Sequence, residues 1–184
     1  MRVISGTAGR RKLVSPTGMD VRPTTDRIKE TLFNILAPYI YESEFLDLFA
    51  GSGGIGIEAL SRGAETAVFV DNNNMAVNCV RKNLEITGLE KKAEVLRMDA
   101  QAAVSRLYSQ RKTFDIIFLD PPYRQELEKN ILLSLEKYKL LKDDGMIIVE
   151  ASSDTEFGYL EDSCFKITRE KKYGSNKHLF IAYK

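Results

Sequence analysis

Hydrophobic residues in this chain gather in short runs that alternate with segments where they recur every three or four residues. Apolar, β-branched runs predict buried parallel strands, and the longer spacing predicts amphipathic helices. The predicted strands are Phe45–Phe49, Thr66–Val70, Ala93–Met98, Phe114–Leu119 and Met146–Glu150. The predicted helices are Ile55–Arg62, Met75–Thr87, Ala100–Ser109 and Gln125–Tyr138. This alternation favours right-handed βαβ crossovers and a parallel sheet covered on both faces.

The two ends depart from this alternation. Residues 1–22 mix β-prone pieces with glycine and proline, which predicts a small basic hairpin or arm ahead of a domain over 23–184. A helix is then predicted to begin at Thr24-Thr25-Asp26 and to stop at Pro38, with an apolar stripe of Ile28, Leu32, Phe33, Ile35 and Leu36. At the other end, a four-residue connection between strands Cys164–Lys172 and Lys177–Tyr183 requires an antiparallel hairpin. The expected fold is α/β, with a mostly parallel sheet of seven strands whose last strand is antiparallel.

Composition narrows the class of protein. A chain of 184 residues with 43% hydrophobic and 29% charged residues is typical of one soluble globular domain. No apolar run approaches the ~18 residues that span a membrane, and the first residues lack the core of a signal peptide, so we expect a cytoplasmic protein. With two cysteines and His178 as the one histidine, a zinc site or a Ser-His-Asp triad is disfavoured, and no metal is expected.

The net charge of +1 is unevenly distributed. Residues 1–30 hold seven Lys/Arg against three acids, and residues 164–184 hold six against Glu170 alone. The ends therefore carry +4 and +5, and the middle carries −8. Basic ends around an acidic middle favour a polyanionic partner, with nucleic acid preferred to simple solvated tails.

A glycine-rich segment with three following acids marks a candidate cofactor site. Asp47-Leu48-Phe49-Ala50-Gly51-Ser52-Gly53-Gly54-Ile55-Gly56 follows the first central strand and opens a helix, where glycines allow close backbone approach to a ligand. The glycines also satisfy the dinucleotide pattern, so a dehydrogenase is an alternative. Asp47, Asp71 and Asp99 each lie at the carboxyl end of a predicted strand and fit S-adenosylmethionine, whose sulfonium and ammonium groups are cationic. The alternative is that these acids only cap helices.

The segment Asp120-Pro121-Pro122-Tyr123 ends the strand Phe114–Leu119 abruptly. Prolines stop the strand and hold a carboxylate and an aromatic ring on a rigid loop at the edge where open α/β sheets bind ligands. A hydrogen-bond acceptor beside a stacking surface suits a planar group that carries NH2, such as a nucleobase. The alternative is a strand-ending turn in which Asp120 caps and Tyr123 packs.

These motifs, in this order, resemble class I S-adenosylmethionine-dependent methyltransferases that act on an exocyclic amino nitrogen, with a Rossmann-like fold. The flanking segments Arg2–Gly6, Gly9–Leu13, Arg22–Asn34, Tyr173-Gly174 and Leu179–Ile181 resemble the RsmD-type bacterial 16S ribosomal RNA guanine-N2 methyltransferases. The resemblance covers essentially the whole chain. It implies methyl transfer to a guanine N2 of 16S ribosomal RNA, on the small ribosomal subunit or an assembly intermediate, by a monomer.

The resemblance also assigns roles to residues. Catalysis is expected from Asp120, Pro121, Pro122 and Tyr123. The cofactor, released as S-adenosylhomocysteine, is expected to contact Asp47, Phe49, Ala50, Gly51, Ser52, Gly53, Asp71, Asn72, Asp99, Ala100 and Thr25. RNA contacts are expected from Arg10, Arg11, Lys12, Arg22 and Arg27, with Lys171, Lys172 and Lys177 as secondary candidates. Some of these residues have alternative roles. Thr25 could only cap the helix, and Arg27 could form an ion pair with Glu30 or Glu58. Glu150 and His178 could be structural and not part of the site.

Three rival functions stay open at the level of sequence. Enzymes that methylate adenine N6 in DNA or RNA, or glutamine N5 in a protein, use a motif similar to Asp120-Pro121-Pro122-Tyr123. Each of these targets is a planar NH2 group that needs the same hydrogen-bond acceptors. A non-catalytic RNA-binding module is a third. The short chain has no room for a target-recognition insert, and Asp rather than Asn at position 120 favours a nucleobase. Neither the choice of guanine over adenine nor the nucleotide that is modified follows from the residues alone.

Overall fold

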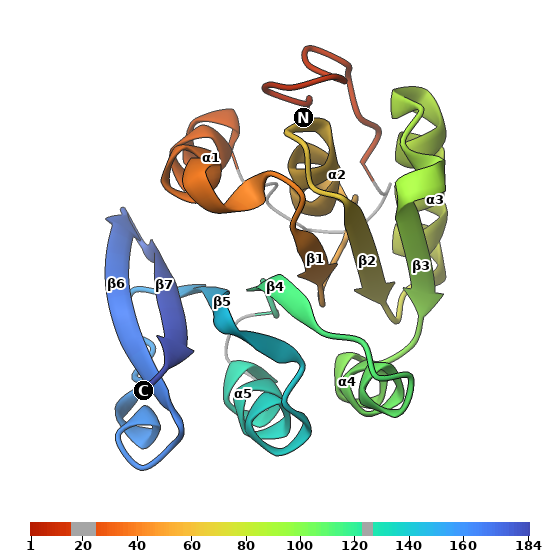
Figure 1. Ribbon diagram of the computed structural model, residues 1–184. Coiled ribbons are helices and arrows are strands. Elements are labelled where there is room, and N and C mark those ends of the chain that lie inside the picture. The colour runs from red at the N-terminus through yellow and green to blue at the C-terminus, as the bar shows by residue number, and fades with distance from the viewer. Residues whose placement is uncertain (16–24, 123–126) are drawn as a thin grey trace.

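A seven-stranded sheet lies between two layers of helices in the computed structural model, which describes residues 1–15, 25–122 and 127–184 (Figure 1). The strands are β1 (Glu44–Asp47), β2 (Thr66–Asp71), β3 (Ala93–Arg97), β4 (Phe114–Leu119), β5 (Leu141–Ser152), β6 (Phe165–Tyr173) and β7 (Asn176–Tyr183). Their order in the sheet is β3-β2-β1-β4-β5-β7-β6. Strands β1 to β5 pair in parallel, and β7 runs antiparallel to both of its neighbours, which confirms the predicted sheet.

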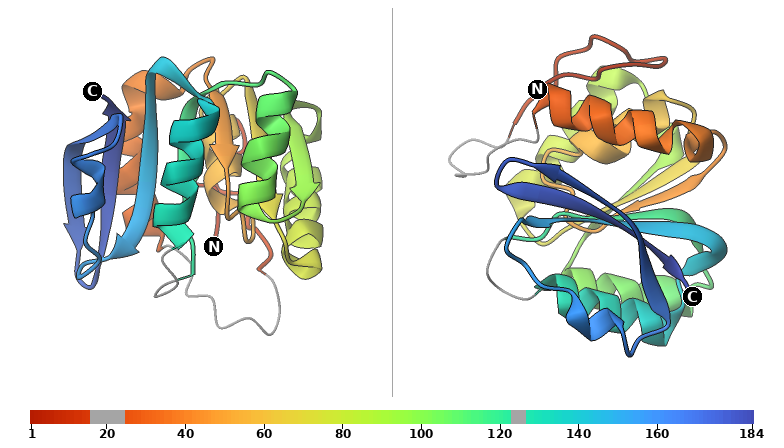
Figure 2. Two further views of the ribbon diagram at one scale, coloured as in Figure 1. Left: turned by 90° about the horizontal axis from the view of Figure 1, so that it is seen from below. Right: turned by 90° about the vertical axis from the view of Figure 1, so that its left-hand side faces the viewer.

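Five α-helices cover the two faces of this sheet. Helices α1 (Asp26–Ile40), α2 (Gly54–Ser61) and α3 (Asn74–Thr87) lie on one face, and α4 (Ala100–Ser109) and α5 (Leu127–Tyr138) lie on the other (Figure 2). The core is accordingly divided into two clusters of buried side chains, one on each side of the sheet. Two short 3-10 helices, η1 (Glu90–Lys92) and η2 (Gly158–Leu160), lie in connections. None of the described helices is long and apolar enough to cross a membrane.

The basic arm is packed against the domain along its described length. Its backbone folds back on itself through a bridge between Arg2 and Lys12. Val3, Ala8 and Leu13 are buried in the same core cluster as α1 and α2. The predicted domain boundary at residue 22 lies outside the described residues and stays a prediction.

Several predicted element boundaries differ from the structure, and two of the differences, in α1 and β5, have a clear physical cause. Helix α1 continues through Pro38 to Ile40, because a proline so near the C-terminus removes only one of the helix's last hydrogen bonds. Strand β5 begins at Leu141 rather than Met146. The predicted Asp144-Gly145 turn falls where Leu141 pairs with Phe114 but Met146 already pairs with Ile116, so the extra residues of β5 form a bulge in a continuous strand.

The apolar stripe of α1 also differs from the prediction. The buried positions are Lys29, Leu32, Phe33, Leu36 and Ile40, which follow the 3.6-residue period, whereas Ile28 and Ile35 are only partly buried. Lys29 is 0% exposed, and its Nζ lies 3.4 Å from a carboxylate oxygen of the equally buried Glu58. A charged residue therefore occupies a core position because another element supplies its counter-charge.

Candidate active site at the carboxyl edge of the sheet

The predicted cofactor residues gather where β1 and β2 end. The loop between β1 and α2 turns through Gly51 and Gly53, at φ values of 54° and 77°, a left-handed region that favours glycine. Space for a Cβ is open at Gly51, whereas a Cβ on Gly56 would lie 2.3 Å from the ring of Phe69. Gly51 and Gly53 therefore shape the turn, and Gly56 lets α2 pack closely on β2.

Asp71 is fixed against this loop by backbone hydrogen bonds. Gly51 N donates to one carboxylate oxygen over 2.9 Å, and Asn73 N donates to the other over 2.8 Å. Asp71 is only partly buried, and Asn72 beside it is exposed. Each carboxylate oxygen keeps a second lone pair, so Asp71 is held rigidly and can still accept hydroxyl groups.

Asp47 is the most buried of the predicted acids, at 1% exposure. Gly56 N donates to Oδ2 over 3.3 Å, while the buried Oδ1 has no partner among the described residues. Burial, with a smaller contribution from the charge of Asp71, raises the pKa of Asp47 to about 7. An orphaned oxygen on a buried carboxyl group indicates a missing hydrogen-bond donor or cation at this position.

The other predicted cofactor residues surround the same edge. Phe49 and Ala50 follow β1, and Ala50 N donates to Val70 O over 2.9 Å. Ser52 accepts a 2.8 Å hydrogen bond at its carbonyl from Asn83, on α3. Asp99 caps α4 by accepting from Gln101 N and Ala102 N, and Ala100 is the buried first residue of that helix. Asp99 therefore caps α4 through one carboxylate oxygen, while the other accepts no bond within the described ranges, and cofactor contact by Asp99 stays a prediction.

Asp120 and the prolines lie immediately beyond β4. Asp120 is partly buried, Pro121 is buried and Pro122 is exposed. Burial raises the pKa of Asp120 well above its usual value, and the nearby charges of Glu150 and Asp47 raise it further. Tyr123 lies outside the described residues, so its stacking role stays a prediction. The prediction that Asp120 follows a strand at the carboxyl edge of the sheet is confirmed.

Strand register sets three polar side chains in one row across this edge, with a fourth close to the row. Leu119 pairs with Val149 and Glu150 pairs with His178, so the row runs Asp120, Glu150, His178 across β4, β5 and β7. Asp47 on β1 pairs with Phe118, so it lies on the same face two residues before Asp120. Glu150 Oε2 and His178 Nε2 lie 3.0 Å apart, and both side chains are nearly fully buried. The approach of Glu150 to Asp120, which the sequence left open, is thus observed.

The predicted RNA residues that the structure describes lie on the arm and at the start of α1. Arg11 Nη1 donates to Ile86 O in the last turn of α3, which lies toward the opposite edge of the sheet. Arg10, Lys12 and Arg27 are exposed, and Arg22 lies outside the described residues. Glu58, one suggested partner of Arg27, instead pairs with Lys29 and Arg62. RNA contact by these side chains stays a prediction.

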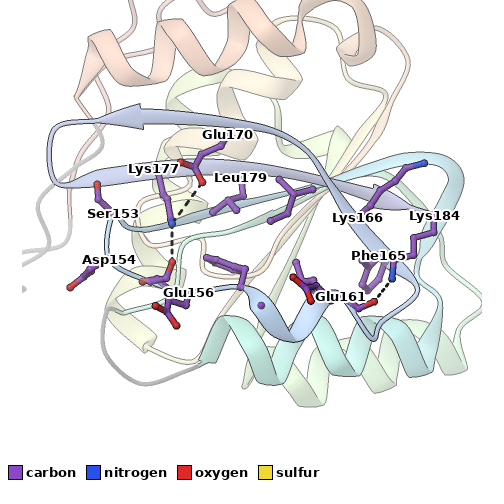
Figure 3. Close-up of a pocket in the computed structure, with 15 residues that line it drawn as sticks. Ser153, Asp154, Glu156, Glu161, Phe165, Lys166, Glu170, Lys177, Leu179 and Lys184 are labelled. Carbon is purple, nitrogen blue, oxygen red and sulfur yellow. Dashed lines mark hydrogen bonds and ion pairs between the residues drawn. The ribbon is translucent and has the colours of Figure 1, made fainter.

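Thr25 caps α1 through a 3.4 Å hydrogen bond that its Oγ1 accepts from Ile28 N, as its capping alternative predicted. Lys177, a secondary RNA candidate, is buried and donates to Thr155 O over 2.8 Å. It lines a cavity of about 810 Å³ between the β6–β7 hairpin and residues 153–161 (Figure 3). Among the described residues, none of the predicted catalytic or cofactor residues lines that cavity.

Sequence reasoning missed Asn83, which joins three segments. Its Nδ2 donates to Ser52 O and to Val14 O, and its Oδ1 accepts from Val14 N. Asn83 is 0% exposed on the core-facing side of α3. A polar residue at an apolar position of the helical period was the signal that could have identified it.

Comparison with known proteins decides the family. The family model described as "Conserved hypothetical protein 95" matches residues 1–182. The chain belongs to this family.

Named relatives of the chain agree with this assignment. "Putative rRNA methyltransferase YlbH" of Bacillus subtilis is 42% identical over 174 residues, 95% of this chain and 94% of that protein. "Ribosomal RNA small subunit methyltransferase D" of Escherichia coli is 40% identical over 151 residues, 82% of this chain and 74% of that protein. A solved Escherichia coli structure, "Putative methyltransferase yhhF", superposes with a TM-score of 0.84 at 34% identity, covering 100% of this chain and 98% of that one. The fold is therefore that of a Rossmann-like methyltransferase.

Proposed function

We propose that this protein transfers a methyl group from S-adenosylmethionine to the exocyclic N2 of a guanine in 16S ribosomal RNA, on the small subunit or an assembly intermediate. The observation that carries the proposal is the placement of Asp120 beside the glycine loop and Asp47 at one sheet edge. Relatives named for ribosomal RNA methylation support the substrate class. The choice of guanine N2 as the methylated atom rests on the resemblance of the flanking segments to guanine-N2 methyltransferases.

The residues at the edge fit the proposed cofactor. When bound, S-adenosylmethionine supplies an electrophilic methyl group on a cationic sulfur. The buried Asp47, with its orphaned Oδ1, offers a carboxylate to a cationic group, and Asp71 offers one to hydroxyl groups. A positive charge bound at this edge would lower the pKa values of Asp47 and Asp120, which burial raises.

Asp120 and the Pro121 carbonyl would orient the guanine amino group. That nitrogen is a poor nucleophile because its lone pair is delocalised into the ring. Two acceptors, each taking one N–H, draw the nitrogen toward tetrahedral geometry and direct the lone pair at the methyl carbon. Alignment of this kind can contribute about 7–11 kcal/mol. As the N–C bond forms and the S–C bond breaks, the amino proton passes to Asp120 or to water, and a raised pKa suits Asp120 to receive it.

A substrate panel tests the proposal. The protein is incubated with labelled S-adenosylmethionine and separately with small ribosomal subunits, naked 16S RNA, DNA and a peptide release factor. Nucleosides and peptides from each reaction are identified by mass spectrometry. We expect N2-methylguanosine from the subunits or the 16S RNA. Label confined to N6-methyladenine or to glutamine would contradict the proposal and identify the rival activity.

A further inference from the structure

We infer that Glu150 selects guanine over adenine by accepting a hydrogen bond from guanine N1 beside Asp120, and that His178 positions the Glu150 carboxylate for this. The inference rests on the proposed function, because it concerns the base that would enter the Asp120 site. It assigns a specificity role to two residues whose structural alternative, a simple buried pair, is equally compatible with their sequence.

Strand geometry places Glu150 next to Asp120. The last paired residues of β4 and β5 are Leu119 and Val149, so Asp120 and Glu150 are the next positions on neighbouring parallel strands, where backbones lie about 4.8 Å apart. Phe118 and Ile148 point into the core cluster beneath α1. Because side chains alternate along a strand, Asp120 and Glu150, two residues further, point to that same face.

Glu150 is held rigidly from its other side. His178 Nε2 lies 3.0 Å from Oε2, and Asn176 Nδ2 donates to Oε1 over 3.3 Å. The His178 side chain is 1% exposed, and the edges of its ring contact Phe118 and Tyr173. A carboxylate fixed by two donors keeps its remaining lone pairs in fixed directions.

The row and the neighbouring Asp47 also contain buried polar atoms that lack partners among the described residues. Asp47 Oδ1 and His178 Nδ1 have none within the part of the chain that the structure describes. Buried polar groups are normally satisfied, so such atoms indicate that a ligand completes the row. Glu150 also raises the pKa of Asp120, which means that the two carboxyl groups interact across this space. A ligand that donates one hydrogen bond to the Asp120 carboxylate and one to the Glu150 carboxylate would relieve the repulsion between them.

Guanine and adenine differ in what they present to two such acceptors. The guanine edge carries N1–H directly beside the N2 amino group, so two neighbouring donors face two neighbouring carboxylates. In adenine the amino group lies beside N1, which bears a lone pair and no hydrogen. Adenine N1 and the Glu150 carboxylate would both be hydrogen-bond acceptors, so they would repel each other. A site built to bond a substrate N–H strongly rejects an analogue that lacks it. The Asp120–Glu150 pair thus matches guanine and opposes adenine.

The test uses a base that separates the two contacts. After mass spectrometry locates the methylated guanine, RNA is prepared with 2-aminopurine at that position. 2-Aminopurine keeps the N2 amino group, but its N1 is an acceptor. We expect wild-type protein to prefer guanine in kcat/KM by roughly 10- to 100-fold, the worth of a hydrogen bond to a charged group.

The variant Glu150→Gln preserves shape and supplies an amide NH2 that can donate to an N1 acceptor. We expect the guanine preference to fall at least about tenfold, with the Kd for S-adenosylmethionine unchanged. Glu156→Gln, at an exposed position beyond the end of β5, is the matched control and should keep the wild-type preference. An unchanged preference in a folded Glu150→Gln protein would overturn the inference.

Two variants of His178 keep the inference testable if Glu150→Gln fails to fold. His178→Gln retains a donor toward Glu150 and should keep most of the preference, whereas His178→Leu removes the donor and should lose it. Equal preferences in the two variants would contradict the positioning role. If wild-type protein forms N2-methylguanosine and only the preference test fails, the proposed function stands without the inference. If wild-type protein forms no N2-methylguanosine, both are overturned.

Discussion

The carboxyl group of Asp47 links the buried edge of the sheet to ligand binding. Its pKa of about 7 means that, in the ligand-free protein, burial disfavours the ionised carboxylate up to neutral pH. Burial is the larger cause, and backbone hydrogen bonds from Gly56 and Phe49 offset only part of it. Ionised Asp47 therefore costs stability in the ligand-free protein, and its proposed role is to bind a cationic group of the cofactor.

This placement predicts how stability depends on pH. Between the ordinary pKa of 3.8 and the folded value of about 7, the folded state holds a proton that the unfolded state has released. The resulting stabilisation is complete below pH 3.8 and is lost as pH rises through about 7. Denaturant unfolding of the ligand-free protein at pH 5 and pH 8 should show the part of this loss that falls between pH 5 and 7, at most about 3 kcal/mol.

Asp47→Asn should reduce that pH dependence, with the part that the raised pKa of Asp120 contributes remaining, and should weaken S-adenosylmethionine binding. The matched control Asp162→Asn, at an exposed position, should change neither. If Asp47→Asn lost stability between pH 5 and pH 8 as wild type does, the titration would belong to another group.

Residue types and spacing identified the site in part. Asp47, Asp71 and Asp120 were recognisable because each follows an apolar run, and strand ends in a parallel sheet share one edge. The Glu150–His178 pair was not, because it joins residues 28 positions apart through the β5–β7 register, which the local sequence does not reveal. The position of Arg11 at α3 was equally hidden, since it depends on how the arm packs.

At the scale of elements, Glu58 on α2 joins the arm to α1. Its carboxylate is 0% exposed and accepts from Ile4 N over 2.7 Å and Ser5 N over 3.0 Å. It also pairs with Arg62 over 2.7 Å and with Lys29 over 3.4 Å. Burial is the largest cause that lowers the pKa of Lys29, and the charge of Glu58 opposes it. Removing Glu58's charge would leave a buried ammonium without its carboxylate.

Glu58→Gln should therefore lower the free energy of unfolding by about 3–5 kcal/mol, the usual cost of breaking a buried ion pair. Urea unfolding measures this. Glu85→Gln is the matched control: it breaks the 2.8 Å pair with Lys82 on the surface of α3 and should cost less than about 1 kcal/mol. Equal effects of the two substitutions would show that the Glu58 cluster does not hold the arm.

Element identities followed from the periodicity more closely than element ends did. Strand β4 and helix α4 have their predicted bounds, because apolar residues begin and end β4 and Asp99 caps the start of α4. Strand β5 starts earlier than expected, since its polar residues Lys142 to Asp144 are unlike a buried strand and are accommodated by a bulge. Tertiary pairing, absent from local sequence, decides such positions.

At the scale of the whole molecule, the two basic ends take different positions. The β6–β7 turn lies at the same sheet edge as Asp120, since β7 begins there beside Glu150. Lys171 and Lys172 on β6 are exposed near that turn. The arm lies along α2 and α3, and Met1 at its start contacts Ser52 of the glycine loop. Both basic ends therefore reach the edge of the sheet that holds the proposed site of chemistry.

The paired substitution Lys171→Ala and Lys172→Ala should weaken RNA binding and flatten its salt dependence. Loss of one or two phosphate contacts lowers the slope of log K against log salt by about 1–2. The matched control, Lys91→Ala with Lys92→Ala, lies on η1 beside the opposite edge and should leave the slope unchanged. A steeper loss in the control pair would relocate the RNA surface.

The central claim is that Asp120, in the row at the carboxyl edge of the sheet, orients the amino group for methyl transfer. The most direct measurement compares Asp120→Ala with wild type for the methylation rate on small ribosomal subunits or 16S RNA and, in the same preparations, for the Kd of S-adenosylmethionine. The account predicts a loss of methylation of at least about 10²-fold, with cofactor affinity largely retained. A variant that folds, binds the cofactor and methylates at the wild-type rate would contradict it.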